Sequence, residues 1–161
     1  MRTSVIVCDC MLGKLARMLR ILGFNVVYYN TISDEGLLDI SKQLNALLLT
    51  RDRELAAKYN PSLYVPHQDV NKQILFVIDE LKKFEILPYE GYLEICPICG
   101  FPIILAEREA IKSEVHEGTY SSYEEFYYCP NCGKIYWKGP QYQELIKRIG
   151  KLNSKLFNNL R

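Results

Sequence analysis

The stretch SVIVCDCMLGKLARMLRILG, residues 4–23, joins a short apolar run to a segment whose apolar residues recur at helical spacing. Residues 4–8 predict a buried strand, because the run is short, continuous and rich in β-branched side chains. Residues 11–22 predict a helix with one apolar face, ended by Gly23 in a left-handed conformation. A strand followed at once by a helix is the repeating unit of α/β domains.

The same order recurs along the first half of the chain. Further strands are predicted at 25–29, 46–50 and 62–65, and further helices at 34–44, 53–58 and 70–84. Short, nearly all-apolar strands that alternate with helices indicate a parallel sheet covered by helices on both faces. In such sheets polar sites gather beyond the carboxyl ends of the strands.

A five-residue pattern, C-P-x-C-G, occurs twice in the second half, at 96–100 and 129–133. Two residues between cysteines let both sulfurs reach one ion, so Cys96, Cys99, Cys129 and Cys132 predict a closed, structural Zn²⁺ site. A redox C-x-x-C pair is the alternative, but it does not need two copies. The pattern predicts a small zinc ribbon, with strands at 101–107, 126–128 and 135–137 and a long loop after the first.

Three aspartates lie where the predicted sheet would gather polar groups. Asp9 follows the first strand, Asp34 opens the helix after the second, and Asp52 follows the third. Carboxylates that converge repel one another unless a hard cation lies among them, and oxygen ligands suit Mg²⁺ or Mn²⁺. Such a site can activate water for attack on a phosphodiester. The alternative for each aspartate is a helix N-cap.

Basic residues accompany these acids and can hold phosphates that the acids would repel. Lys14 and Arg17 lie on the first helix, and Arg51 and Arg53 flank Asp52. Local ion pairs, which contribute little to stability, are the alternative. Arg20, one turn beyond Arg17, is expected to face solvent.

The motifs together resemble the Mut7-C family. They are VCDCMLGKLARMLRILGF at 7–24, DEGLL at 34–38, LLTRDR at 48–53, and the two knuckles with KIYWKG at 134–139. The resemblance implies a PIN-like nuclease domain with a C-terminal zinc ribbon. It also implies hydrolysis of RNA at a catalytic Mg²⁺ or Mn²⁺ held by Asp9, Asp34 and Asp52. Asp69 is the best-placed candidate for a fourth acid.

The ribbon segment is unusually aromatic. Tyr136, Trp137 and Lys138 are the best candidates for RNA contact, because aromatic rings stack on unpaired bases. Packing into a small core is the alternative for the rings.

Charge and composition complete the expectations. Residues 85–139 carry 4 Lys/Arg against 9 Asp/Glu, a net charge of −5, and residues 140–161 carry 5 against 1, a net of +4. The expected organisation is a nuclease domain at 1–84, the ribbon at 93–139 and a basic terminal helix at 140–161. Free thiols with zinc knuckles indicate a reducing compartment, the cytoplasm. No signal pattern or membrane span is expected.

RNA is the expected partner, with the ribosome or tRNA as candidate settings. A non-catalytic RNA-binding or ribosome-associated zinc-ribbon protein is the main alternative to a ribonuclease. A toxin-like nuclease whose acids are blocked by a partner is a further alternative.

Overall fold

The computed structural model describes residues 5–86, 88 and 94–152, with the backbone alone at 148–152. The chain divides into two compact units, Met1–Tyr89 and Glu90–Arg161. Most of the segment 85–92, which separates the expected nuclease domain from the expected ribbon, and residues 153–161 of the expected terminal helix lie outside the described residues.

The first unit is built on a parallel sheet, as the sequence predicts. Its strands are β1 (Val5–Cys8), β2 (Asn25–Tyr28), β3 (Leu47–Thr50) and β4 (Ser62–Tyr64), in the order β2-β1-β3-β4. All three pairings are parallel, with Val7 opposite Val27 on one side and Leu48 on the other. The central strands β1 and β3 are almost entirely buried, which explains their continuous apolar sequence.

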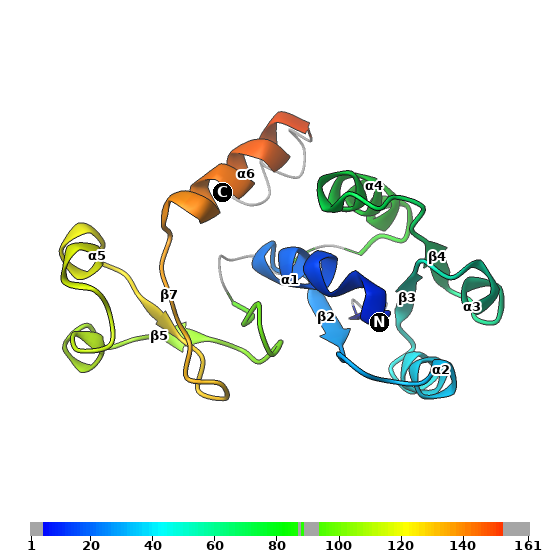
Figure 1. The fold of residues 1–161 in the computed structure, drawn as a ribbon, viewed down its shortest axis with the longest axis horizontal. Helices are drawn as coiled ribbons and strands as arrows, with labels where there is room; N and C mark the ends of the chain where they lie inside the picture. Colours follow the sequence, from blue (N-terminus) through cyan, green and yellow to red (C-terminus); the bar gives the residue numbers. More distant parts are fainter. Residues whose placement is uncertain (1–4, 87, 89–93, 153–161) are drawn as a thin grey trace. The chain divides into compact units, whose positions relative to one another are not determined.

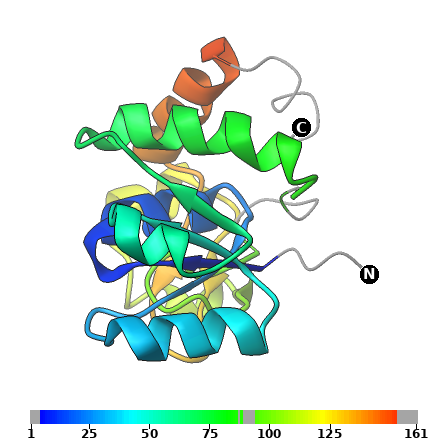
Figure 2. The same ribbon diagram turned by 90° about the vertical axis from the view of Figure 1, so that its right-hand side faces the viewer.

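Helices cover both faces of this sheet (Figures 1 and 2). They are α1 (Gly13–Ile21), α2 (Asp34–Gln43), α3 (Arg53–Ala57) and α4 (Val70–Lys83). Helices α1 and α4 lie on one face, and α2 lies on the other (Figure 2). Val7 and Leu48 pack with Leu37 of α2 and Leu55 of α3 in one buried cluster, so alternate strand residues serve opposite faces.

The connection between β1 and α1 differs from the prediction. A 3-10 turn, Cys10–Leu12, precedes α1, and α1 therefore begins at Gly13 instead of Met11. The Tyr28 hydroxyl donates a hydrogen bond to the Cys10 carbonyl (3.0 Å), and a Cβ at position 13 would lie 2.6 Å from that hydroxyl. Glycine at this position therefore makes room for the tyrosine that holds the turn. The predicted end of the helix is confirmed, since Gly23 has φ +87°.

The expectation that Arg20 faces solvent is wrong. Its side chain is only 4% exposed, and Nε donates a hydrogen bond to the Val26 carbonyl at 2.9 Å. Spacing by threes from Lys14 and Arg17 suggested a basic stripe, but α1 turns Arg20 inward against β2, where a backbone acceptor receives it.

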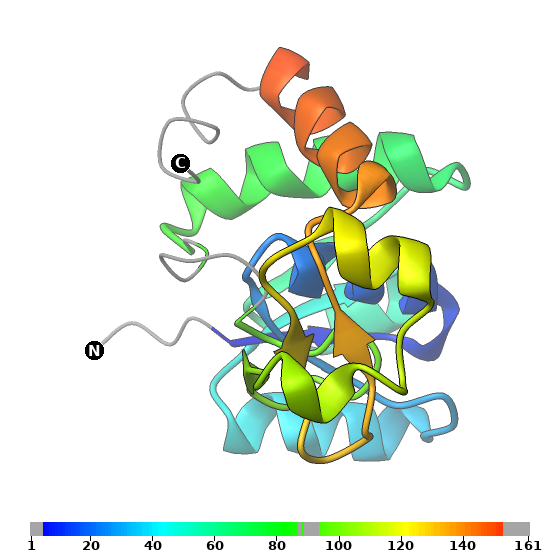
Figure 3. The ribbon, with the colours of Figure 1, turned by 90° about the vertical axis from the view of Figure 1, so that its left-hand side faces the viewer.

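The second unit contains an antiparallel sheet of very short strands, in the order β5-β6-β7 (Figure 3). These are β5 (Ile104–Leu105), β6 (Tyr127–Tyr128) and β7 (Ile135–Tyr136). The strand expected at 101–107 is thus reduced to two residues, with an isolated bridge between Ile95 and Pro102.

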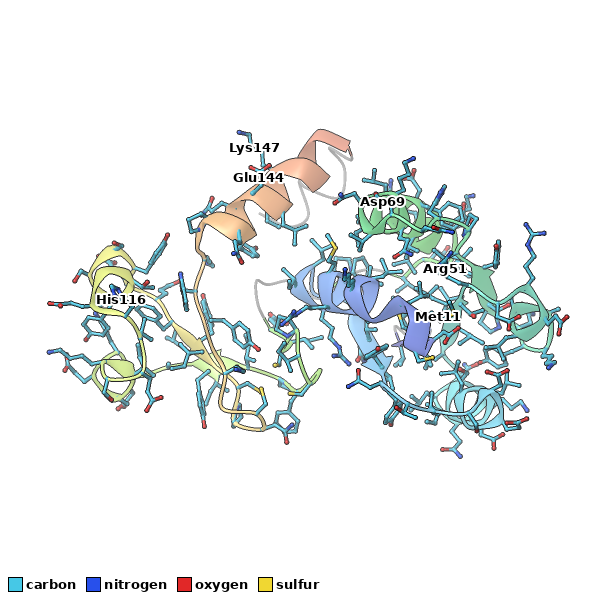
Figure 4. All side chains as sticks on the ribbon, in the orientation of Figure 1. Met11, Arg51, Asp69, His116, Glu144 and Lys147 are labelled. Carbon is cyan, nitrogen blue, oxygen red and sulfur yellow. The ribbon has the colours of Figure 1, made fainter. Side chains whose placement is uncertain are left out.

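Helical segments occupy part of the region between β5 and β6 that was expected to be a long loop. They are a 3-10 turn, Glu109–Ile111, and α5 (Glu117–Ser122). His116, labelled in Figure 4, caps α5 because its Nδ1 accepts a hydrogen bond from the Gly118 amide at 3.2 Å. After β7 the helix α6 (Pro140–Leu152) follows, orange in Figure 3.

The aromatic residues of the second unit build its core around Phe126, which is 1% exposed. Tyr120 stacks on Phe126 with centroids 6.1 Å apart, and Trp137 packs against it at 6.2 Å. Arg108 lies over the Tyr120 ring, 4.1 Å from its centroid, and donates to the backbone carbonyls of Tyr120 and Tyr123. These contacts support packing as the role of the rings.

None of the helices in the described part of the chain combines the length and the apolar character needed to cross a bilayer.

The buried Arg20 generates a stability prediction. Arg20→Met keeps much of the buried apolar stem but removes the hydrogen bond to Val26, so we expect the free energy of unfolding to fall by about 1–3 kcal/mol. Arg17→Met, on the exposed face of the same helix, should change it by less than about 0.5 kcal/mol. Urea denaturation of both variants measures this, and equal midpoints would contradict the role assigned to Arg20.

Candidate active site and metal centre

The direction in which successive strands are added to the sheet reverses between β1 and β3. We call the carboxyl edge of the sheet between these two strands the reversal point. From β1 the chain crosses through α1 to β2 on one side, whereas β3 pairs on the other side of β1. Ligands of open α/β sheets bind at such a reversal. Asp9 directly follows β1 and Asp52 lies two residues after β3, so these two aspartates flank this point.

A hydrogen-bond chain joins Asp9 to the Asp52 backbone through Thr50. The Thr50 hydroxyl donates to Oδ2 of Asp9 at 2.7 Å and accepts from the Asp52 amide at 2.9 Å. Thr50 is fully buried, and Asp9 is only 7% exposed. A buried carboxylate requires such partners, and Oδ1 of Asp9 also accepts from the Met11 amide at 3.3 Å. The carboxylate is therefore held in one orientation at the reversal point.

The alternative role of the aspartates, helix capping, holds for some of them. Oδ1 of Asp52 accepts the amides of Glu54 (2.7 Å) and Leu55 (3.0 Å), which makes Asp52 the N-cap of α3. Asp69, the candidate fourth acid, caps α4 through the Lys72 amide at 3.0 Å.

Asp34 differs from these capping residues. Ser33 is the N-cap of α2, with its hydroxyl oxygen accepting from the Gly36 amide at 3.1 Å. Asp34 occupies the first helical turn with an exposed side chain. Capping therefore does not account for Asp34, although a negative charge is favourable in a first turn.

The three aspartates do not form a compact ligand group. Among the described residues, only the four cysteines make a group of three or more metal-binding side chains with all ligand atoms within 4.8 Å of one another. The catalytic metal site therefore stays a prediction.

The four basic residues predicted to hold phosphates differ in their exposure and contacts. Lys14 and Arg17 are exposed on α1. Arg53 lies over the ring of Tyr64, 5.0 Å from its centroid. Arg51 directly follows β3, and its Nε is buried with no hydrogen-bond partner among the described residues. Figure 4 labels three residues that follow strands of this sheet: Met11 after β1, Arg51 after β3 and Asp69 after β4. A buried guanidinium nitrogen needs an acceptor, and for Arg51 the described residues do not supply one.

Two cysteines of the first unit flank Asp9. Burial raises the pKa of Cys8 to about 12, which keeps this interior thiol neutral. Cys10 is exposed, and a hydrogen bond with Asp9, added to by burial, raises the pKa of its thiol. Both groups are therefore thiols at neutral pH, and neither is an activated nucleophile.

The four knuckle cysteines gather in the second unit. Cys96 and Cys132 have sulfurs 3.6 Å apart, and Cys99 and Cys129 have sulfurs 3.5 Å apart. Zn–S bonds of about 2.3 Å in a tetrahedron place the sulfurs ~3.8 Å apart, so these separations fit one zinc ion. The glycines that follow the knuckles, Gly100 and Gly133, have φ of +73° and +72°, a left-handed conformation that favours glycine and lets the chain turn sharply.

Burial and hydrogen bonds shift the pKa values of these thiols in different directions. Burial opposes ionisation of Cys99, but hydrogen bonds from the Asn131 side chain and the Phe101 amide lower the pKa of its thiol to about 6. Burial raises the pKa of Cys129 to about 12, against hydrogen bonds from the amides of Cys132 and Asn131. Since a metal ligand must be a thiolate, binding would displace protons from this cluster.

The residues predicted to contact RNA all have partners inside the second unit. The Tyr136 hydroxyl lies 3.0 Å from the Cys96 sulfur, and Trp137 packs on Phe126. Nζ of Lys138 lies 3.7 Å from Oε2 of Glu125. Their role in RNA contact stays a prediction.

Comparison with known proteins identifies the family. The protein-family model described as "Mut7-C RNAse domain" matches residues 4–149, which is nearly the whole chain. No curated protein and no solved structure matched the chain. The chain belongs to the Mut7-C RNAse domain family, as its motifs indicated. Membership indicates a nuclease-related role with RNA as the substrate class.

Sequence reasoning missed Thr50, the residue that joins Asp9 and Asp52. Its signal was present, because a polar side chain ends an otherwise apolar strand, Leu47–Thr50. Tyr28 was also missed, since an aromatic residue near the end of a strand is ordinary in a sheet.

The Thr50 contacts generate a second prediction. Thr50→Val keeps the shape but leaves a buried carboxylate oxygen of Asp9 without its donor, so we expect a loss of about 1–3 kcal/mol in unfolding free energy. Thr50→Ser retains the hydroxyl and should recover most of this loss. Thermal unfolding of both variants at one pH makes the comparison, and a valine variant as stable as the serine variant would rule out the hydrogen bond as the cause.

Proposed function

We propose that this protein is a metal-dependent ribonuclease of PIN-like architecture, with its active site at the carboxyl edge between β1 and β3. The observation that carries the proposal is the buried Asp9 carboxylate, which Thr50 holds at the reversal point of the strand order. A fold has little reason to bury a carboxylate there unless its charge is used, because burial of a charge is costly. Family membership supplies the substrate class.

Asp9 and Asp52, with Asp34 from the start of α2, would hold Mg²⁺ or Mn²⁺ there. Their oxygens suit such a cation, which binds through one or two carboxylates and keeps several waters. When bound, the ion would activate water and offset negative charge on the phosphodiester. Since the three carboxylates do not all lie within 4.8 Å of one another, at least one of them would reach the ion through a bound water.

The chain's own cations would orient the RNA backbone. Arg51 directly follows β3 and is only partly buried, so its guanidinium group would be a suitable partner for a phosphate oxygen. Lys14 and Arg17 would extend this positive region along α1, and Arg53 stacked on Tyr64 would flank it. Cytoplasmic location and a ribosomal or tRNA setting stay predictions from the sequence.

Replacing acids by amides tests catalysis separately from capping. Asn caps helices about as well as Asp, so Asp52→Asn should leave stability nearly unchanged. Loss of a metal-binding charge should nevertheless slow cleavage of single-stranded RNA with Mn²⁺ by roughly 10²-fold or more, as should Asp9→Asn. Asp79→Asn is the matched control, because Asp79 is exposed on α4 and pairs with Lys82.

Two outcomes would overturn the enzymatic proposal. Equal cleavage by the wild type and both amide variants would identify the activity as a contaminant. RNA binding without cleavage by any of them would favour a non-catalytic RNA-binding protein, a role supported by the capping function that already occupies Asp52.

We also propose that the cysteine cluster holds one structural Zn²⁺. The sheet of the second unit has strands of only two residues, and strands this short do not supply enough packing to be stable without a further cross-link such as a bound metal ion.

Metal removal tests this role. Chelation should unfold the second unit, while the parallel sheet of the first unit keeps its structure, because the cysteines lie outside it. Hydrogen exchange before and after chelation distinguishes the two units. Unchanged protection of residues 94–139 in metal-free protein would contradict a structural zinc.

A further inference from the structure

The Tyr136 side chain reaches the proposed zinc site from the third strand of the small sheet. Its hydroxyl oxygen lies 3.0 Å from the Cys96 sulfur. That sulfur belongs to a fully buried residue and lies 3.6 Å from the sulfur of Cys132. The hydroxyl therefore contacts a buried member of the four-cysteine cluster.

The direction of this hydrogen bond follows from the chemistry of the bound state. In the metal-free protein either the hydroxyl or the thiol can donate. A cysteine that ligates a metal is a thiolate and has no proton, so the tyrosine must then be the donor. A donor to a thiolate draws electron density from the sulfur and lowers its nucleophilicity.

The other knuckle sulfurs receive donors of a different kind. The Phe101 amide and the Asn131 side chain bond to Cys99, and the Lys134 amide bonds to Cys132. The two amides belong to residues that directly follow their own knuckles, and Asn131 reaches Cys99 from the second knuckle. Tyr136 instead reaches Cys96 from β7, 40 residues away in sequence.

We propose that Tyr136 is a positioning residue of the metal site, whose hydroxyl bonds to the metal-bound Cys96 thiolate and protects it from electrophiles and oxidants. The proposal rests on the structural zinc proposed above. It gives Tyr136 a role distinct from RNA stacking.

The neighbouring strand offers a matched control. Tyr127 lies directly opposite Tyr136 in the β6–β7 pairing, and its hydroxyl donates to the exposed Glu125 at 3.1 Å. Tyr127→Phe therefore removes one hydroxyl from the same sheet without touching a cysteine.

The experiment measures zinc content and zinc release from the full chain. Wild type, Tyr136→Phe and Tyr127→Phe should each hold one zinc. Under excess N-ethylmaleimide, Tyr136→Phe should release its zinc about fivefold faster than the other two, which is the effect of one lost hydrogen bond of ordinary strength. A Tyr136→Phe release rate equal to that of the wild type, or a Tyr127→Phe rate as fast as that of Tyr136→Phe, would overturn the proposal.

Two further readouts separate the possible failures. Wild type without zinc would overturn the structural metal site itself, and with it the role of Tyr136. If Tyr136→Phe does not fold, mass mapping of partly alkylated wild type decides: Cys96 should be modified after Cys129, which is equally buried. Modification of Cys96 as early as Cys129 would overturn the protective role.

Discussion

The first unit depends on one requirement, that a carboxylate inside a protein must be hydrogen-bonded. Asp9 meets this requirement through Thr50, a residue from the neighbouring strand. The same hydroxyl accepts the Asp52 amide and so places the start of α3. The order of β1 and β3, the burial of Asp9 and the position of Asp52 are therefore coupled through a single side chain.

The second unit solves a different problem, because its strands are too short to enclose a core. Four cysteines bring its two knuckles together, and Phe126 with its aromatic and cationic neighbours supplies the packing. Tyr136 connects these two devices, since it belongs to the sheet and its hydroxyl contacts a cysteine. Aromatic residues in such a unit thus serve its structure, whatever surface they also present.

Capping and catalysis place overlapping demands on Asp52. One of its oxygens accepts two amides at the start of α3, which fixes the carboxylate without requiring any ligand. A fixed carboxylate is also a good metal ligand, because little side-chain freedom is lost on binding. The two roles are compatible, so Asp52 can cap α3 through one oxygen while the other stays available for a metal ion.

The sequence by itself determined the α/β class, the parallel sheet and the four-cysteine cluster, because apolar periodicity and cysteine spacing are local properties. It also predicted Gly23 in a left-handed conformation, which the structure confirms. Only the tertiary structure decided that Arg20 is buried, that Thr50 joins Asp9 to Asp52, and that Tyr136 meets Cys96. Each of these depends on a partner in another segment of the chain, and no local pattern records which distant residue a side chain will meet.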